Sequence, residues 1–202
     1  MFSIMELFNY TELNILRSIS NDLKINIEYS DKLKWWFEFE GRYGLIESNE
    51  FDSEIDCIRS SIINFKKEFF HSESLFDHYY EKGWKYYDKG NYQEAKNHFL
   101  KSLVLAGGND DVKENYTVIG VCECRIGNFD ISLKYLNIGV NLKGAYFAFD
   151  PYWERAKLHL IMGNYSSAIV DLQKLENFEK ELLDKQEIEL LKILSPLIDN
   201  MI

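Results

Sequence analysis

The sequence predicts a mostly α-helical protein in which a small α+β domain precedes a row of helical hairpins. A Gly-Asn-aromatic triplet recurs three times at nearly equal spacing. Apolar and polar residues alternate between residues 23 and 46, and apolar residues recur at three- and four-residue steps through most of the remaining chain. We therefore expect an α-β-β-β-α domain over residues 1–72, and helical hairpins with a final capping helix over residues 76–202.

The first domain is predicted from local periodicity. A helix near residues 11–19 precedes three segments with a period of two, which indicates a three-stranded antiparallel meander. Asp52 or Ser53 can cap the following helix, whose apolar residues are spaced by three and four positions through Phe69. The expected strands lie within residues 23–29, 33–39 and 43–46.

The helical hairpins are predicted from the recurring triplet, whose copies are 37 and 36 residues apart. Glycine suits the end of one helix, asparagine can cap the next, and the aromatic residue can pack into the seam between them. The copies are Gly90-Asn91-Tyr92, Gly127-Asn128-Phe129 and Gly163-Asn164-Tyr165. The expected helices cover residues 76–88, 91–105, 111–125, 128–142, 149–161 and 165–177, and an amphipathic capping helix covers residues 180–199.

The residues around the first triplet extend this pattern. Tyr79, Gly83 and Tyr86 precede it, and Ala95 and Phe99 follow it. With these residues, positions 76–178 resemble three tetratricopeptide repeats, a family of stacked helical hairpins. The chain departs from the family pattern in its longer period and its lack of a closing proline. An unrelated antiparallel helical bundle would obey the same packing rules.

A concentration of acidic residues follows the predicted strands. Seven of them lie between positions 38 and 56, where Arg42 is the only basic residue. They belong either to a solvated hairpin edge and helix start or to a surface that attracts a basic partner. These residues are Glu38, Glu40, Glu47, Glu50, Asp52, Glu54 and Asp56.

The resemblance to tetratricopeptide repeats implies a concave groove lined by the first helix of each hairpin. Tyr80, Trp84 and Tyr87 would form an aromatic stripe there, a composition typical of binding hot spots. Packing of the stripe on the first domain or on residues 146–149 is the alternative. The residues implied to bind a partner are Tyr80, Trp84, Tyr87, Cys124, Arg125, Trp153 and Lys157.

Motifs for catalysis are not found in the sequence. The four histidines lack metal-ligand spacing, and the glycine pair Gly107-Gly108 lacks the features of a phosphate loop. The cysteines Cys57, Cys122 and Cys124 are interpreted as small hydrophobic residues. We therefore expect no enzyme activity, no metal and no cofactor.

Charge and hydropathy restrict the expected partners. The 202 residues carry a formal net charge of −10, which argues against binding to nucleic acid or to an anionic membrane surface. No signal peptide or membrane-spanning run is found, so a cytoplasmic location is expected.

The leading hypothesis is a non-catalytic module that binds another protein or peptide through the groove, the acidic surface or both. A narrower alternative is a bacterial immunity protein or antitoxin that neutralises a basic toxin, and the abundance of Asn, Ile and Lys is typical of an AT-rich bacterial genome. A regulator that binds a small molecule, or an enzyme, is a further alternative.

Overall fold

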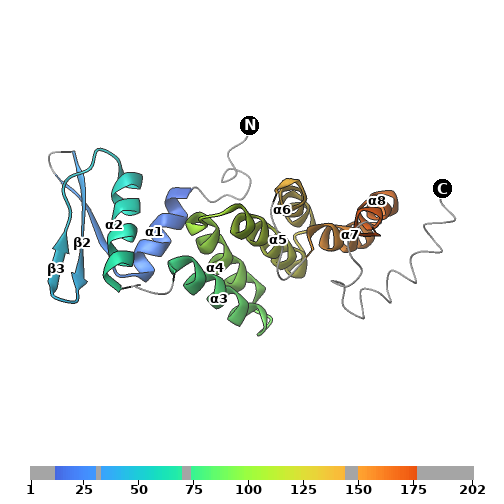
Figure 1. Cartoon of the computed structure of the whole chain (residues 1–202), viewed down its shortest axis with the longest axis horizontal. Helices are drawn as coiled ribbons and strands as arrows, with labels where there is room; N and C mark the ends of the chain where they lie inside the picture. Colours follow the sequence, from blue (N-terminus) through green and yellow to red (C-terminus); the bar gives the residue numbers. More distant parts are fainter. Residues whose placement is uncertain (1–11, 31–32, 70–73, 144–149, 177–202) are drawn as a thin grey trace. The chain divides into compact units, whose positions relative to one another are not determined.

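The computed structural model describes residues 12–30, 33–69, 74–143 and 150–176, which fall into two compact units, residues 1–107 and 108–202. The first unit contains α1 (Glu12–Asp22), β1 (Asn26–Tyr29), β2 (Trp35–Gly41), β3 (Gly44–Glu47), α2 (Glu54–Phe69), α3 (Leu75–Tyr87) and α4 (Tyr92–Leu105). The second unit contains α5 (Asn109–Ile126), α6 (Phe129–Asn141), α7 (Pro151–Ile161) and α8 (Tyr165–Glu176) (Figure 1).

The predicted fold class is confirmed at the level of its elements. The described residues are mostly helical, and they include one small three-stranded antiparallel sheet near the N-terminus. The three predicted helix–turn–helix pairs are α3–α4, α5–α6 and α7–α8. The predicted capping helix at 180–199 lies outside the described residues. Membership in the tetratricopeptide family and the predicted domain division near residue 72 both stay predictions.

The sheet has the order β1-β2-β3 and one buried face. Phe37 and Phe39 of β2 are each 2% exposed, and they stand opposite Ile27 of β1 and Ile46 of β3. Helix α2 packs against this face, where the ring of Phe65 lies 5.2 Å from that of Phe39 (Figure 1). Burial of each such aromatic side chain contributes about 1.5–3 kcal/mol to stability.

Helix α1 connects the sheet layer to the first hairpin within the first unit. It packs against both α2 and α4, and its buried residues include Ile15, Leu16 and Ile19. At its C-terminal end the Asp22 carboxylate accepts a hydrogen bond from the Lys101 ammonium of α4, at 2.7 Å. The two hydrophobic patterns predicted as separate domains therefore meet at α1.

Each helical hairpin turns at a glycine in the left-handed region. Gly90, Gly127 and Gly163 have φ values of +74°, +95° and +75°, which residues with a Cβ atom adopt at a cost. The predicted asparagine cap is present in the first hairpin, where the Asn91 side chain accepts a hydrogen bond from the Glu94 backbone N–H. It is wrong for Asn128, whose side-chain amide instead donates to the Glu123 carboxylate at 2.7 Å.

Small residues let the paired helices approach closely. A Cβ atom added at Gly83 would lie 2.5 Å from the Phe99 ring, and one at Gly120 would lie 2.8 Å from Leu136. The Ser132 hydroxyl donates a 2.7 Å hydrogen bond to the Gly120 carbonyl, which further ties α6 to α5. The small residues around the first two triplets thus have a direct packing cause.

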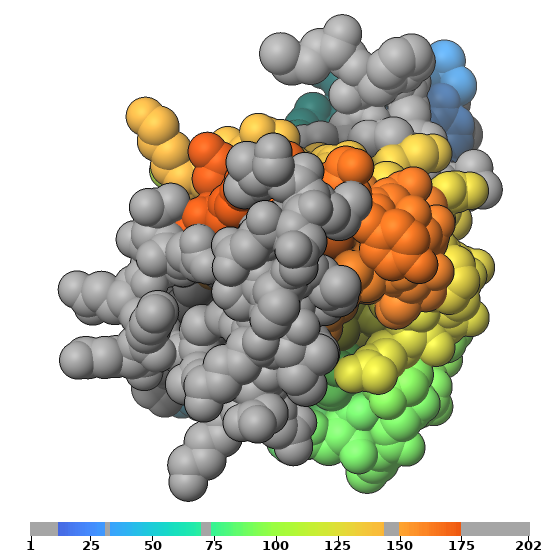
Figure 2. Space-filling view, turned by 90° about the vertical axis from the view of Figure 1, so that its right-hand side faces the viewer, coloured from blue at the N-terminus to red at the C-terminus, as the bar shows by residue number. Residues whose placement is uncertain are grey.

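The last hairpin buries a compact apolar cluster and keeps an exposed surface. Trp153, Ala156 and Leu172 form the cluster between α7 and α8. On the outside, Ile161, Tyr165 and Val170 are each more than half exposed. Part of this hairpin is seen in orange in the space-filling view of Figure 2. None of the helices in the described ranges is long and apolar enough to cross a membrane.

Candidate functional site

The face of the sheet that points away from α2 is rich in carboxylates. We call it the outer face, and strand register assigns its members because directly paired residues of antiparallel strands share a face. Its members are Asn26, Glu28, Trp36, Glu38, Glu40, Leu45 and Glu47. No lysine or arginine occupies a paired position on this face, so its four carboxylates are not neutralised by a cation within it.

Glu38 lies at the centre of the outer face. It stands opposite Asn26 of β1 on one side and opposite Glu47 of β3 on the other. The Asn26 amide donates to the Glu38 carboxylate at 3.1 Å and to the Glu28 carboxylate at 2.8 Å. Like charges directly opposite each other in a sheet are destabilising, so the pair Glu38 and Glu47 lowers the stability of the strands that carry it.

The remaining residues of the predicted acidic surface do not join the outer face. Arg17 of α1 forms a two-pronged ion pair with Glu54, with distances of 2.6 and 2.7 Å between nitrogen and oxygen atoms. Lys34 pairs with Asp52. Glu50 and Asp56 are exposed. Of the seven predicted acids, Glu38, Glu40 and Glu47 therefore share one face, together with Glu28.

Glu28 is a functional candidate that the acidic run in the sequence does not include. It lies ten residues before Glu38, on a different strand. The period-two pattern already places Glu28 on the opposite side of its strand from Ile27. Its proximity to Glu38 depends on the pairing register of β1 with β2, which local sequence does not specify.

The predicted aromatic stripe forms a continuous row along α3. The Trp84 ring centre lies 6.1 Å from that of Tyr80 and 5.3 Å from that of Tyr87, both in edge-to-face geometry. Behind the row, the buried Phe99 ring of α4 lies 5.5 Å from Trp84. All three stripe residues are half-buried, so each contributes packing as well as surface.

The predicted groove residues of the second unit differ in exposure. Arg125 is exposed at the end of α5, whereas Trp153 is only 3% exposed and belongs to the α7–α8 cluster. The Lys157 ammonium lies 2.6 Å from the Glu154 carboxylate and 5.6 Å from the centre of the Trp153 ring. Cys124 is half-buried, and burial and the nearby Glu154 raise the pKa of its thiol, which disfavours the reactive thiolate.

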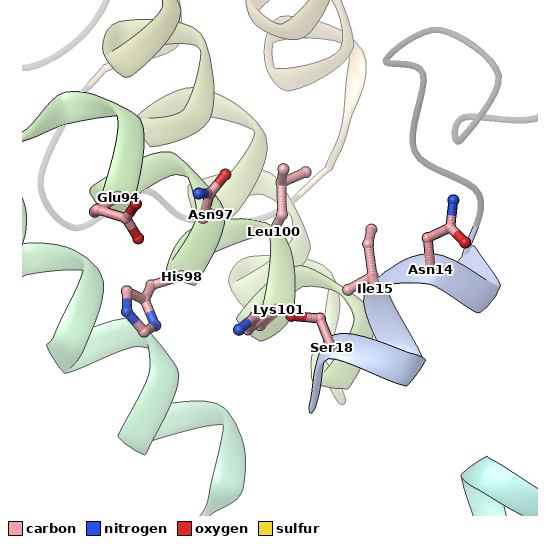
Figure 3. Close-up of a pocket in the computed structure, with 8 residues that line it drawn as sticks. All are labelled: Asn14, Ile15, Ser18, Glu94, Asn97, His98, Leu100 and Lys101. Carbon is pink, nitrogen blue, oxygen red and sulfur yellow. The ribbon is translucent and has the colours of Figure 1, made fainter. Parts of the chain in front are cut away.

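A pocket of about 390 Å³ lies between α1 and α4, entirely within the first unit. Figure 3 shows Glu94, Asn97, His98 and Lys101 along one side of α4, with Asn14 and Ser18 on α1. Burial, together with the Lys101 and Lys82 ammonium groups, lowers the pKa of His98, so this histidine is neutral at pH 7. Lys101 pairs with Asp22, whereas Glu94 adds a carboxylate to the lining, so the pocket is polar.

Within the described ranges, no group of three or more His, Cys, Asp or Glu residues is arranged to hold a metal ion. Comparison with models of protein families finds no match for this chain, and comparison with curated proteins finds none either. The functional argument therefore rests on the chemistry of the surfaces described above.

Proposed function

We propose that this protein is a non-catalytic binding module that recognises a basic protein or peptide through the outer face of its sheet. The observation that carries the proposal is the grouping of Glu28, Glu38, Glu40 and Glu47 on one largely exposed face without a neutralising cation at any paired position. Opposed carboxylates cost stability, and a basic partner would remove that cost upon binding.

The apolar members of the outer face support the same function. Trp36 is half-buried at one end of the face, and Leu45 is 55% exposed opposite Glu40 at the other. A face that combines carboxylates with two large apolar side chains suits a partner that presents lysine or arginine beside aliphatic or aromatic groups. Trp36 and Leu45 would supply contact area, while the carboxylates would set orientation and association rate.

Affinity capture with matched variants tests the proposal. The outer-face variant carries Glu28→Gln, Glu38→Gln, Glu40→Gln and Glu47→Gln. The control variant makes the same charge change at exposed positions off the face, with Asp56→Asn, Glu81→Gln, Asp88→Asn and Asp130→Asn. We expect the wild type and the control to retain a basic partner from a lysate of the source organism, and the outer-face variant to lose it. Equal capture by all three proteins would exclude the outer face as the site.

The tetratricopeptide resemblance supports a second binding surface on the hairpins. The aromatic row of Tyr80, Trp84 and Tyr87 follows one side of α3 and would lie in the groove if the hairpins stack as in that family. Replacement of Trp84 and Tyr87 by alanine should then release the bound partner. If every partner stays bound, the groove does not contribute.

A toxin-neutralising immunity protein is a narrower form of the same proposal. The outer face would cover a basic surface of the toxin, as expected for inhibition of a nuclease, for example. Co-expression with the products of adjacent genes tests this form, with growth of the host as the measurement. It is wrong if the toxicity of every neighbouring product is the same with and without this protein.

The pocket between α1 and α4 favours a different candidate, the binding of a small polar molecule. Its volume lies within the range of ligand sites, and its lining offers carboxylate, amide, imidazole and hydroxyl groups. A thermal-shift screen of metabolites tests it, since a ligand at 100 times its dissociation constant adds about 2.7 kcal/mol to stability. A screen without any stabilising compound would contradict this candidate.

A further inference from the structure

Strand β1 forms one edge of the sheet. The strand order is β1-β2-β3, so β1 pairs with β2 along one side only. Each residue of an antiparallel strand directs its backbone N–H and C=O groups to the same side, and successive residues alternate between the two sides. The register of the sheet therefore determines which backbone groups of β1 face away from β2.

The hydrogen bonds of β2 establish these directions. The N–H and C=O groups of Trp35 both bond to Phe51, and the Phe37 carbonyl accepts a hydrogen bond from the Ser48 N–H at 2.9 Å. Because Ser48 directly follows β3, the odd-numbered residues of β2 direct their backbone groups toward β3, and the even-numbered residues direct theirs toward β1. Odd-numbered residues of β1 pair with odd-numbered residues of β2, as Ile27 does with Phe37.

Ile27 and Tyr29 consequently direct their backbone groups away from β2. No residue in the described ranges supplies a hydrogen-bond partner for these two N–H and two C=O groups. Glu28 lies between them and is exposed, and Tyr29 is 52% exposed. A row of unpaired backbone groups at an accessible sheet edge is a template for the addition of another strand.

The side chains of β1 indicate the chemistry of a strand that fits this edge. On the outer face, the Asn26 amide donates to the Glu28 and Glu38 carboxylates, at 2.8 and 3.1 Å, and thereby holds two carboxylates beside the edge. Ile27 and Tyr29 lie on the opposite face and offer an aliphatic and an aromatic side chain. An added strand would meet acidic groups on one face and apolar groups on the other.

Charge disfavours a second copy of this chain as the added strand. If two copies of β1 paired antiparallel and used all four unpaired groups of each, Ile27 would stand opposite Tyr29 and Glu28 would stand opposite Glu28 of the second copy. Like charges directly opposite each other are destabilising, and each chain carries a net charge of −10. At the other edge of the sheet, Gly44 of β3 has a φ of +133°, outside the range of a regular strand.

We infer that β1 binds an extended segment of a basic protein, which adds to the sheet as a further strand. Lysine or arginine side chains of this segment face Glu28 and Glu38, and they alternate with apolar side chains that pack on Ile27 and Tyr29. The inference rests on the proposed function and adds to it the backbone contacts of the partner. In complexes of this kind, backbone hydrogen bonds provide affinity and alternate side chains provide specificity.

NMR titration of the full-length protein with two short synthetic peptides tests the inference. One peptide alternates lysine and valine, and the other has the same composition with all lysines before all valines. We expect the alternating peptide to bind about tenfold more tightly, because only its strand form places the two residue types on separate faces. In its complex, the amide hydrogens of Ile27 and Tyr29 should exchange with solvent about tenfold more slowly than in the free protein.

A proline substitution tests the backbone contact separately. Ile27→Pro removes an N–H group that faces away from β2, so the hydrogen bonds between β1 and β2 are kept. Ile27→Val is the matched control, since valine is similar in size to proline and retains the N–H group. The alternating peptide should bind Ile27→Pro about tenfold more weakly than Ile27→Val. Hydrogen exchange in the wild-type complex decides the question if Ile27→Pro does not fold.

Several results would overturn the inference. These are equal affinity for the two peptides, equal affinity of the two variants, and slowed exchange at Leu45 and Glu47 of β3 in place of Ile27 and Tyr29. A wild-type dimer that Ile27→Pro dissociates would identify a second copy as the occupant and would also overturn it. Binding that Ile27→Pro keeps and the outer-face variant loses would refute strand addition but support the proposed function, whereas binding that both variants keep would refute both.

Discussion

The contact between Gly83 and Phe99 illustrates how one residue type determines helix spacing. A Cβ atom at Gly83 would approach three atoms of the Phe99 ring at 2.5–2.8 Å, closer than a real contact allows. Phe99 is fully buried and cannot move aside without displacing its neighbours. We expect Gly83→Ala to lower the free energy of unfolding by about 1–3 kcal/mol, through overpacking.

Urea denaturation of Gly83→Ala and of Gly107→Ala measures this effect against a matched control. A Cβ atom at Gly107 meets no other atom within 4 Å, and this residue does not have a positive φ. Gly107→Ala should therefore leave the free energy of unfolding nearly unchanged. Equal destabilisation by the two substitutions would show that the Phe99 contact is not responsible.

Two histidines make the stability depend on pH. Burial is the main cause that lowers the pKa of both His98 and His159 below the usual value of 6.5. Below pH 6.5 the unfolded chain therefore binds more protons than the folded protein, and stability falls as the pH falls toward the folded-state pKa values. Above pH 6.5 both states are neutral at these sites and the effect vanishes.

The variant with His98→Gln and His159→Gln should consequently show a weaker loss of stability between about pH 7 and pH 5 than the wild type. The free energy of unfolding from urea titrations at several pH values gives the two slopes. Identical slopes for variant and wild type would contradict the assignment.

At the scale of an element, a buried ion pair joins the two helices of the last hairpin. The Arg155 guanidinium donates to both oxygens of the Asp171 carboxylate, at 2.8 and 2.5 Å, and also to the Asn137 side chain at 2.8 Å. The Asp171 side chain is 2% exposed. Helix α7 is thereby connected to α8 and to α6 through a single arginine.

Removal of one partner of this pair should cost about 3 kcal/mol, because a buried charge is left uncompensated. We expect this loss for Asp171→Ala in urea denaturation. The double variant with Arg155→Met and Asp171→Leu leaves no unpaired charge. Its loss of unfolding free energy should therefore be smaller than the sum of the losses for Arg155→Met and Asp171→Leu measured separately. Additive losses would show that the two side chains do not depend on each other.

At the scale of the whole molecule, the predicted domain division can be compared with the compact units. Sequence periodicity favours a first domain that ends at residue 72, whereas the first compact unit extends to residue 107. The first compact unit extends beyond residue 72 because α1 packs on α4 and pairs with it through Asp22 and Lys101. A fragment without α3 and α4 would expose to water the part of α1 that packs on α4.

We therefore expect a fragment of residues 1–107 to unfold cooperatively and a fragment of residues 1–72 to lack a cooperative transition. Circular dichroism during thermal denaturation measures this for both fragments. Lys101→Ala in the longer fragment removes only the ion pair between α1 and α4. It should lower the free energy of unfolding of that fragment by about 1 kcal/mol. A cooperative transition in the shorter fragment would support the division at residue 72.

Local features of the sequence account for the elements but not for the candidate site. Glycine at the three turns and period-two alternation before residue 47 act within a few residues, so the helical hairpins and strands could be predicted from the sequence alone. The final arrangement of the carboxylates could not. Glu28 reaches Glu38 only through strand register, and Asp52 and Glu54 are neutralised by Lys34 and Arg17, which are 18 and 37 residues away along the chain.

Local sequence is sufficient to predict the helical content, the hairpin turns, the small sheet and the run of acidic residues between positions 38 and 56. The tertiary structure alone decided which carboxylates stay unneutralised on one face and which are paired within the fold. The physical reason is that turns and periodicity depend on neighbouring residues, whereas charge neutralisation and exposure depend on segments brought together by folding.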